Sequence, residues 1–197
     1  MPHPTARGPL PGRLFTAVLL LASVVLGGCG TVTSTGRVPA DPGASWALLP
    51  IDNLSSTPLA GRKAATLVET RLRARGVTRV SHVEARSDGG DAGLALVALI
   101  DDGANRDAAL VRARANGHRY AMTGTVHEWH YKSAPDREPV VGLNLSLIDV
   151  SDGQVMWQGS ASRSGWGNAS LSAVADRVVG ELLGDVALQL DAAPADR

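Results

Sequence analysis

The sequence of 197 residues is poor in sulfur and in aromatic side chains, with one Cys, four Trp, two Tyr and one Phe. The single cysteine, Cys29, excludes an intrachain disulfide framework and a cysteine-rich zinc site. Charge of one sign is also lacking, because 19 basic side chains balance 19 acidic ones, and this disfavours binding to nucleic acid. Hydrophobic residues make up 44% and charged residues 19%, so we expect a folded domain whose core consists mainly of Val, Leu, Ile and Ala.

Motifs that carry catalysis or bind nucleotides are absent: the sequence contains no Gly-x-Ser-x-Gly, no P-loop and no Gly-x-Gly-x-x-Gly. The segment His127-Glu128-Trp129-His130 differs from the metalloprotease motif, because its histidines are three positions apart rather than four. On a strand this spacing points His127 and His130 to opposite faces, so they could not chelate one ion. We therefore expect no enzyme activity, no metal and no cofactor. A hydrolase with a dispersed Ser-His-Asp triad stays open as an alternative.

The first 28 residues have the pattern of a signal peptide. Two arginines, with no acidic residue, precede the apolar run Leu14–Leu26. As a helix this run is about 20 Å long, which is too short for the roughly 30 Å hydrocarbon core of a bilayer. The run ends at Leu26-Gly27-Gly28-Cys29, which resembles a bacterial lipobox. We predict that residues 1–28 are cleaved off and that Cys29 is acylated; the alternative is a buried free cysteine.

Removal of residues 1–28 takes away two of the 19 basic side chains and no acidic one, so the remaining 169 residues carry a formal charge of −2. Three acyl chains on Cys29 would anchor the protein stably. Gly30 stands where an Asp would retain an enterobacterial lipoprotein in the inner membrane, so we expect the outer membrane. Thr31–Ser45 lacks apolar periodicity and is rich in Thr, Ser, Gly and Pro, so residues 29–45 are predicted to be the acylated cysteine and a flexible tether.

The folded part is predicted to begin with a buried strand at Trp46–Ile51. Thr57 is the expected N-cap, and Pro58 the first-turn proline, of a helix that runs through Arg75 and ends at Gly76. A second strand is expected at 77–83. The apolar segment 94–100 fits either a strand or a helix and stays open.

The next elements follow from changes in hydrophobic period. Asn105 or Asp107 is the expected cap of a helix that runs to Asn116. Strands are predicted at 119–131, 141–150 and 155–163, with an Asp-Gly turn between the last two. One face of this sheet is expected to be covered, and the other to be solvated or to contact a partner.

The clearest pattern is a final helix, capped by Ser170, whose apolar stripe runs from Leu171 to Leu190 and includes Val186. The predicted fold is therefore a single α/β domain over residues 46–190, with element order β-α-β-α-β-β-β-α and a mixed sheet. Residues 191–197 are expected to be a disordered tail.

Trp166 lies in the glycine-flanked segment Ser164-Gly165-Trp166-Gly167-Asn168, between the last strand and the last helix. An indole in such a loop is suited to the headgroup zone of a membrane, where its N–H stays hydrated. The alternative is that Trp166 is a lid over the hydrophobic end of the core. The pattern alone favours neither interpretation.

Several segments of the predicted domain together resemble the PelC family, the outer-membrane lipoproteins of the Pel exopolysaccharide export system. They are distributed from Trp46 to about Leu183 and include no catalytic residue: Trp46-Ala-Leu-Leu-Pro50 with Asn53, Ser56-Thr-Pro58 with Ala60-Gly61-Arg62, Tyr120-Ala-Met-Thr-Gly124, His127-Glu-Trp129-His-Tyr-Lys132, Glu138-Pro139 with Val141-Gly142, Asp149, and Arg163-Ser-Gly-Trp166.

The resemblance implies the small α/β fold shared with the curli-secretion lipoprotein and the amino-terminal domain of the Tol-Pal translocation protein. It also implies a homo-oligomeric, twelvefold periplasmic ring under the outer membrane, coaxial with a β-barrel exporter that has periplasmic repeats. In that family a loop Trp contacts the membrane, which here is Trp166, and an acidic surface attracts a cationic polysaccharide. Candidate acids are Asp52, Glu128, Asp136, Glu138, Asp149 and Asp152.

The resemblance therefore implies a non-enzymatic role in exopolysaccharide export and biofilm formation. The alternatives are another lipoprotein of the same fold, either a curli-type secretion ring or an activator of cell-wall synthases, and the hydrolase considered above.

Overall fold

The computed structural model describes residues 30–84, 102–133, 135 and 137–188. Several predictions lie outside these residues: the signal peptide 1–28, the acylation of Cys29, the choice between strand and helix at 94–100, the position of Asp136, and the tail 191–197.

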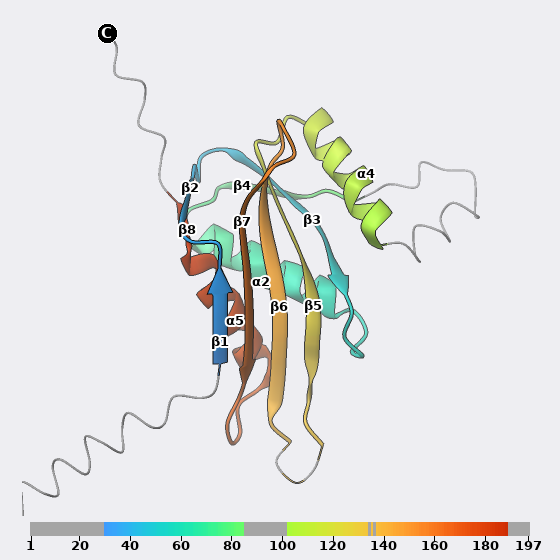
Figure 1. The fold of residues 1–197 in the computed structure, drawn as a ribbon, viewed down its shortest axis with the longest axis vertical. Helices are drawn as coiled ribbons and strands as arrows, with labels where there is room; N and C mark the ends of the chain where they lie inside the picture. The colour runs from blue at the N-terminus through green and yellow to red at the C-terminus, as the bar shows by residue number, and fades with distance from the viewer. Residues whose placement is uncertain (1–29, 85–101, 134, 136, 189–197) are drawn as a thin grey trace, which may run out of the picture.

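The described residues form one mixed α/β domain (Figure 1). In chain order its elements are β1 (Gly30–Ser34), β2 (Val38–Ala40), β3 (Ser45–Asn53), α2 (Ala60–Ala74), β4 (Arg79–His82), α4 (Asp102–Ala115), β5 (Tyr120–Tyr131), β6 (Pro139–Asp149), β7 (Val155–Ser164), α5 (Leu171–Gly184) and β8 (Val186–Leu188). From β3 to α5 this order is the predicted β-α-β-α-β-β-β-α, which is thereby confirmed. Three short strands, β1, β2 and β8, are added at its ends.

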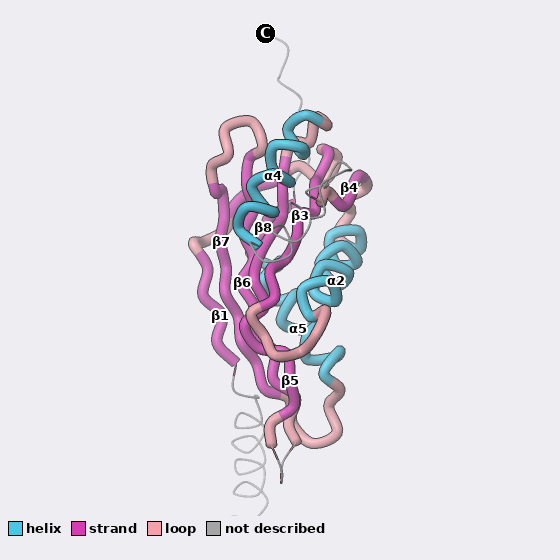
Figure 2. The backbone as a smooth tube through the Cα atoms, turned by 90° about the vertical axis from the view of Figure 1, so that its right-hand side faces the viewer, coloured by secondary structure: helices cyan, strands magenta, loops and turns pink. Residues whose placement is uncertain are grey.

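Six strands form one sheet in the order β1-β7-β6-β5-β3-β4, and β2 and β8 form a separate parallel pair. Strand β3 is parallel to β4 and β5, whereas the β5–β6, β6–β7 and β7–β1 pairs are antiparallel. Helices α2 and α5 cover one face, and in Figure 1 they lie behind the strands. Of the described helices, only α4 lies on the other face, which we call the open face, and it lies near one end (Figure 2).

Alternation along β3 divides the core into two clusters. Trp46 and Leu48 point into the large cluster under α2 and α5, while Ala47 and Leu49 point into a small cluster under α4. Helix α4 reaches the sheet through alanines, which allow its backbone to approach closely. The core is therefore built mainly of aliphatic side chains, as the composition predicts, with Trp46 and Trp157 among its largest members.

Helix α2 packs through small residues at a spacing of four, Ala60 and Ala64, followed by Val68. Gly61 is needed for the close approach, because a Cβ atom there would lie 2.1 Å from the carbonyl oxygen of Ile51. Gly76 has a φ of +95° and ends the helix as predicted.

The predicted start of α2 is wrong. The helix begins at Ala60, its N-cap position is Leu59 with a φ of 62°, and no side chain caps it. The hydroxyl of Thr57 donates to the carbonyl oxygen of Trp129 instead. The hydroxyl expected to cap the helix thus bonds to strand β5 instead, and the local sequence does not reveal this partner.

The predicted start of α4 is also wrong, since Asn105 and Asp107 lie inside a helix that already includes Asp102. The predicted stop is confirmed: the helix ends at Ala115, and Gly117 has a left-handed φ of +72°.

The segment predicted as a tether contains two strands, which is a correction. Strand β1 pairs antiparallel with β7, and β2 pairs parallel with β8. Ser34 Oγ also donates to Asp185 Oδ2 over 2.6 Å, so both ends of the described chain are joined. A Thr- and Ser-rich segment is as compatible with an edge strand as with a linker, and the free edge of β7 decides between them.

The predicted final helix is correct at its start and too long at its end. Ser170 Oγ accepts a hydrogen bond from the backbone N–H of Ala173 over 3.1 Å, which confirms the cap. The helix ends at Gly184, and Val186 belongs to β8 rather than to a helical stripe. The guanidinium of Arg75 donates to the carbonyl oxygens of Leu183 and Val186, thereby fixing this end.

Candidate functional site

The two ends of the sheet carry different loops and strand termini. Strand β1 starts at Gly30, whose Cα pairs with that of Arg163 near the end of β7. The same end, which we call the anchor end, holds the β5–β6 hairpin and the β7–α5 loop (Figure 1). The opposite, distal end holds the β6–β7 turn and the start of β3. Because Cys29 directly precedes Gly30, a group attached to Cys29 would be tied to the anchor end.

Trp166 lies at the anchor end with 73% of its surface exposed. The backbone beside it is fixed, since the N–H of Gly165 donates to the carbonyl oxygen of Pro139 over 2.8 Å. A Cβ atom on Gly165 would meet Pro139 Cγ at 2.7 Å and Val174 Cγ2 at 2.8 Å, so only glycine fits there. The indole is therefore presented to its surroundings, and the interpretation of Trp166 as a lid over the core is wrong.

Two candidate acids lie on the open face. Asp52 forms an ion pair with Arg106 of α4 over 3.0 Å and is largely buried. Glu128 Oε2 accepts a hydrogen bond from Ser162 Oγ over 2.9 Å and lies against Gly142, where a Cβ atom would come within 2.8 Å of it. Both carboxylates are thus engaged within the domain.

Two further candidates lie in the β6–β7 turn at the distal end. Asp149 Oδ1 accepts hydrogen bonds from the hydroxyl and the N–H of Ser151, at 2.6 and 2.8 Å. These bonds lower the pKa of Asp149, so its carboxylate stays charged even in mild acid. Asp152 accepts from the N–H of Gln154 over 2.8 Å and is exposed.

Glu138 lies at the anchor end and pairs with Lys132 across the β5–β6 hairpin over 2.8 Å. Asp136 lies outside the described residues. The candidate acids are therefore not gathered into one patch of the protomer. They are divided among the open face, the distal end and the anchor end. Asp149 is partly buried, and of the described candidates only Asp152 is exposed.

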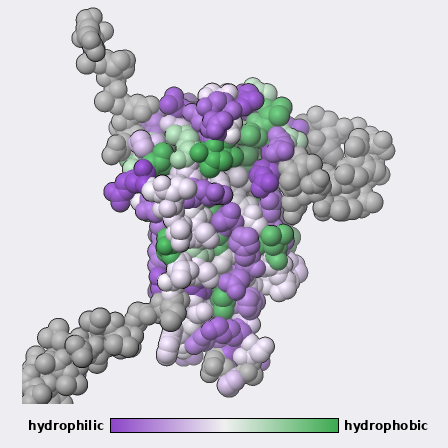
Figure 3. Space-filling model, in the orientation of Figure 1, coloured by the Kyte–Doolittle hydropathy of each residue, from purple (hydrophilic) through white to green (hydrophobic). Residues whose placement is uncertain are grey.

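The rest of the open face is lined by small polar side chains. One row across four strands consists of Thr125, Asn144, Ser160 and Thr33. Figure 3 shows this face as mostly pale or purple, with few hydrophobic atoms over the strands. The sequence predicted its alternation but not that four strands would align their polar residues into rows.

A β-bulge changes the interpretation of the histidines. The register shifts between Val126 and Glu128, so one residue of β5 is extra. His127 Nε2 contacts Asn144 Oδ1 at 3.0 Å on the open face, while Trp129 returns to the core. His130 follows Trp129 and so faces the same side as His127, which makes the predicted opposition of the two histidines wrong. Among the described residues, no group of three His, Cys, Asp or Glu side chains could hold a metal ion.

A serine–histidine cluster that the sequence did not reveal lies near the distal end. Ser45 Oγ is 2.7 Å from His118 Nδ1, and Ser81 Oγ is 3.2 Å from His118 Nε2. Burial lowers the pKa of His118, so its imidazole is neutral at neutral pH. Because both ring nitrogens contact serines, neither is left for the carboxylate that orients the histidine of a catalytic triad. The cluster joins β3, β4 and the turn before β5.

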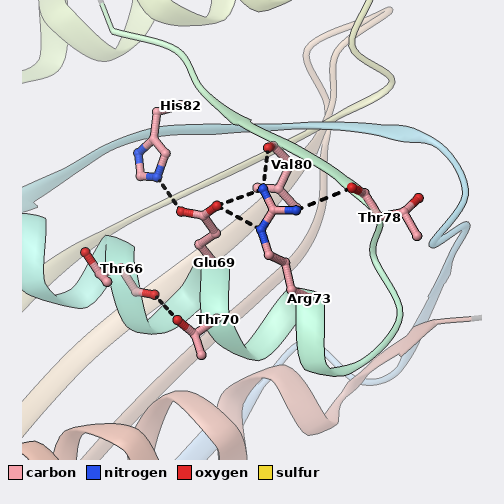
Figure 4. Close-up of polar contacts among 7 residues, drawn as sticks. All are labelled: Thr66, Glu69, Thr70, Arg73, Thr78, Val80 and His82. Atoms are coloured by element: carbon pink, nitrogen blue, oxygen red, sulfur yellow. Dashed lines mark hydrogen bonds and ion pairs between the residues drawn. The ribbon is translucent and has the colours of Figure 1, made fainter.

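A charged cluster between α2 and β4 is likewise explained by the fold (Figure 4). Glu69 contacts His82 Nε2 at 2.8 Å and Arg73 at 2.8 Å. The guanidinium of Arg73 also donates to the carbonyl oxygens of Val80 and Thr78, at 2.9 and 3.4 Å. The side chains thus attach the edge strand β4 to the helix.

No helix in the described part of the chain is both long and apolar enough to cross a membrane.

Comparison with known proteins gives a consistent result. No protein-family model matches the chain. No curated protein matches it either. Among solved structures, a PelC dodecamer from Paraburkholderia phytofirmans is 33% identical, with a TM-score of 0.66, and the match covers 82% of this chain and 99% of that one. A dodecamer of a single-residue variant of PelC from the same organism, in another crystal form, gives 33% identity and a TM-score of 0.67, with 82% and 100% covered. By its sequence and its fold, the chain belongs to the PelC family.

Proposed function

We propose that the protein is an outer-membrane lipoprotein that assembles into a periplasmic ring and guides a cationic exopolysaccharide, of the Pel type, to a β-barrel exporter. The observation that carries this proposal is the 33% identity to PelC dodecamers over 82% of the chain. On this proposal the chain acts without catalysis, by binding and positioning.

Strand β1 supports one orientation of the domain relative to the membrane. If Cys29 is acylated after cleavage of residues 1–28, its lipid is attached one residue before a strand that is paired along its whole length with β7. No linker then separates the lipid from the domain, so the anchor end would lie against the bilayer. Trp166 is exposed at that end, where an indole can insert into the headgroup zone.

The distal end would then face the periplasm, from which the polymer arrives. Asp149 and Asp152 are the candidate acids at this end, and the depressed pKa of Asp149 keeps its charge. A formal charge of −2 per mature chain is small for one copy. In a closed ring the same surface is repeated on every copy, so its potential adds up around the opening and can attract a polycation.

The test is complementation of a strain that lacks this protein, with secreted polymer and ring assembly measured separately. We expect Cys29→Ala to abolish the membrane fraction and most secretion. Asp149→Asn with Asp152→Asn should reduce secretion while the ring still sediments as an oligomer. Wild-type protein that stays monomeric in detergent, or that turns over a deacetylated hexosamine polymer, would overturn the proposal.

Trp166→Ala provides a second, local test. Because the indole is exposed, the variant should fold as the wild type does, with an unchanged melting temperature, and secrete less polymer. Unchanged secretion would contradict the proposed membrane contact of Trp166, but it would not contradict the proposed ring.

A further inference from the structure

At the anchor end, the β5–β6 hairpin extends beyond the start of strand β1, as the pairing registers of the strands show. One row of paired residues across the sheet consists of Gly30, Arg163, Val141 and Trp129. From Trp129 the strand β5 continues by two more residues to Tyr131, which is about 7 Å at about 3.3 Å per residue. Cys29 is only one residue beyond the same row. The hairpin therefore passes the level at which the proposed lipid is attached.

A cavity of about 430 Å³ lies at this hairpin, lined by Tyr131, Lys132, Ser133 and Arg137. We call it the tip pocket. Its aromatic wall is fixed, because the hydroxyl oxygen of Tyr131 accepts a hydrogen bond from the N–H of Leu171 over 3.1 Å. That bond joins the hairpin to the first residue of α5, beside the loop that carries Trp166. Tyr131 is nevertheless 52% exposed, so its ring can also contact a ligand.

The two cations of the tip pocket differ in their surroundings. Lys132 Nζ contacts Glu138 Oε2 at 2.8 Å. Arg137 is exposed, and it forms no ion pair with any side chain that the structure describes. Its backbone has a φ of 45°, in the left-handed region that non-glycine residues adopt rarely and at a cost. The hairpin thus holds an exposed guanidinium, without an ion pair to any of the described side chains, in a less favourable backbone conformation.

A guanidinium beside a phenol ring and a hydroxyl suits an anionic, oxygen-rich group. The planar fork of arginine matches the oxygens of a phosphate diester in a bidentate arrangement. Tyrosine is enriched at the headgroup level of membranes, where its ring is apolar and its hydroxyl is wet. A cationic polymer would be repelled by Arg137, so this pocket does not suit the proposed cargo.

We propose that the tip pocket binds the phosphate of an anionic phospholipid headgroup, with Arg137 as the phosphate ligand and Tyr131 as the supporting wall. The proposal rests on the membrane orientation given under the proposed function. It adds a second contact, on the hairpin, to the contact expected at Trp166. Together with the lipid on Cys29, the three points would fix the tilt of each copy and not only its distance from the bilayer.

The experiment uses the acylated full-length mature protein in phosphatidylethanolamine vesicles. With Cys29 acylated, Pro135→Cys introduces the only free thiol, which takes a fluorophore at the tip of the hairpin. Phosphatidylglycerol or phosphatidylcholine, each with a nitroxide near the top of one acyl chain, is then titrated in as a quencher. We expect phosphatidylglycerol to be preferred about fivefold, which corresponds to about 1 kcal/mol for one basic residue at an anionic surface.

Matched variants identify the ligand. Arg137→Gly removes the charge and suits the positive φ, so the variant should fold normally. Its fluorophore should be quenched equally by phosphatidylglycerol and phosphatidylcholine. Arg137→Lys should keep part of the preference. Arg79→Ala, at the distal end, removes an exposed arginine from a strand edge and should change nothing. Thermal melting of each variant checks that it is folded.

Three outcomes would overturn the proposal: equal quenching by the two lipids in the wild type, a preference that survives in Arg137→Gly, or an equal loss in Arg79→Ala. Competition by an excess of inorganic phosphate would assign the pocket to free phosphate instead of a lipid. Ring assembly and polymer secretion are measured on the same variants. An intact ring with no lipid preference therefore contradicts only the tip pocket, whereas a monomer without secretion contradicts the proposed function itself.

Discussion

The two faces of the sheet are built from the same strands and yet differ in their side chains. The face under α2 and α5 holds an aliphatic core with Trp46 and Trp157. The open face carries rows of Ser, Thr and Asn, with a small apolar cluster only under α4. Since successive residues of a strand point to opposite faces, each strand contributes to both. The difference teaches that the core and the open surface can be changed independently, by substitutions one residue apart on the same strand.

The largest expected effect lies on the covered face. Leu182 of α5 is fully buried in the large cluster. We expect Leu182→Ala to lower the free energy of unfolding by about 3 kcal/mol, from lost burial and from the cavity left behind. Ser160→Ala, on the open face, should change it by less than about 0.5 kcal/mol. Denaturant titration of both variants checks the comparison, and equal losses would show that the two faces do not differ.

A smaller effect is expected where α2 approaches β3. Gly61→Ala places a Cβ atom where it would be 2.1 Å from the carbonyl oxygen of Ile51, so the helix must shift. We expect a loss of about 2 kcal/mol in the free energy of unfolding. Gly184→Ala is the matched control, since nothing lies within 4 Å of a Cβ atom there. Thermal unfolding of the pair measures the difference, and a neutral Gly61→Ala would contradict the close helix–strand contact.

The next prediction concerns the edge that both faces share. Ser34→Ala removes the hydrogen bond to Asp185, whose length is 2.6 Å. A loss of about 1 kcal/mol is expected for one such bond. Amide hydrogen exchange should also become faster in β1 but not in β6. If the amides of β1 exchange as fast as an unfolded chain already in the wild type, the segment is a tether after all.

The smallest effect is a pH dependence at the edge strand β4. Hydrogen bonds from His82 and Arg73 lower the pKa of Glu69 below its ordinary value of 4.5. The resulting stabilisation is present above about pH 4.5 and is lost as the pH falls through the folded-state pKa. Glu69→Gln should therefore destabilise the domain by less than about 1 kcal/mol at neutral pH, because the group is partly exposed. Thermal melts in strong acid should show no difference, and a difference that does not vary with pH would refute the carboxylate's role.

Prediction from the sequence worked where one periodicity dominated. Strand β6 and the first turns of α5 were identified because their apolar residues follow a single repeat, and the glycine stops at Gly76 and Gly117 hold because left-handed backbone favours that residue. It failed where a partner distant in the sequence decided: the hydroxyl of Thr57 bonds to β5 rather than capping α2.

For the candidate site, the sequence identified residues but not their positions in the fold. The exposure of Trp166 appears only in the fold, and the position of Gly30 at the same end of the sheet follows from the pairing of β1 with β7. The candidate acids were named from a family resemblance that did not say where in the fold each one lies. Their division among three regions appears only in the structure. The bulge at His127 could not be read from the alternation that it interrupts.

The sequence by itself determined the order of the central elements, the aliphatic core and the resemblance to the PelC family, because periodicity and motif spacing are local properties. Only the tertiary structure decided which end of the sheet carries the start of the described chain, which face stays open, and that the Thr- and Ser-rich segment is a strand. Those outcomes depend on which free edges and carbonyl groups meet in space. Backbone hydrogen bonds form wherever a partner is offered, and no local pattern encodes the partner.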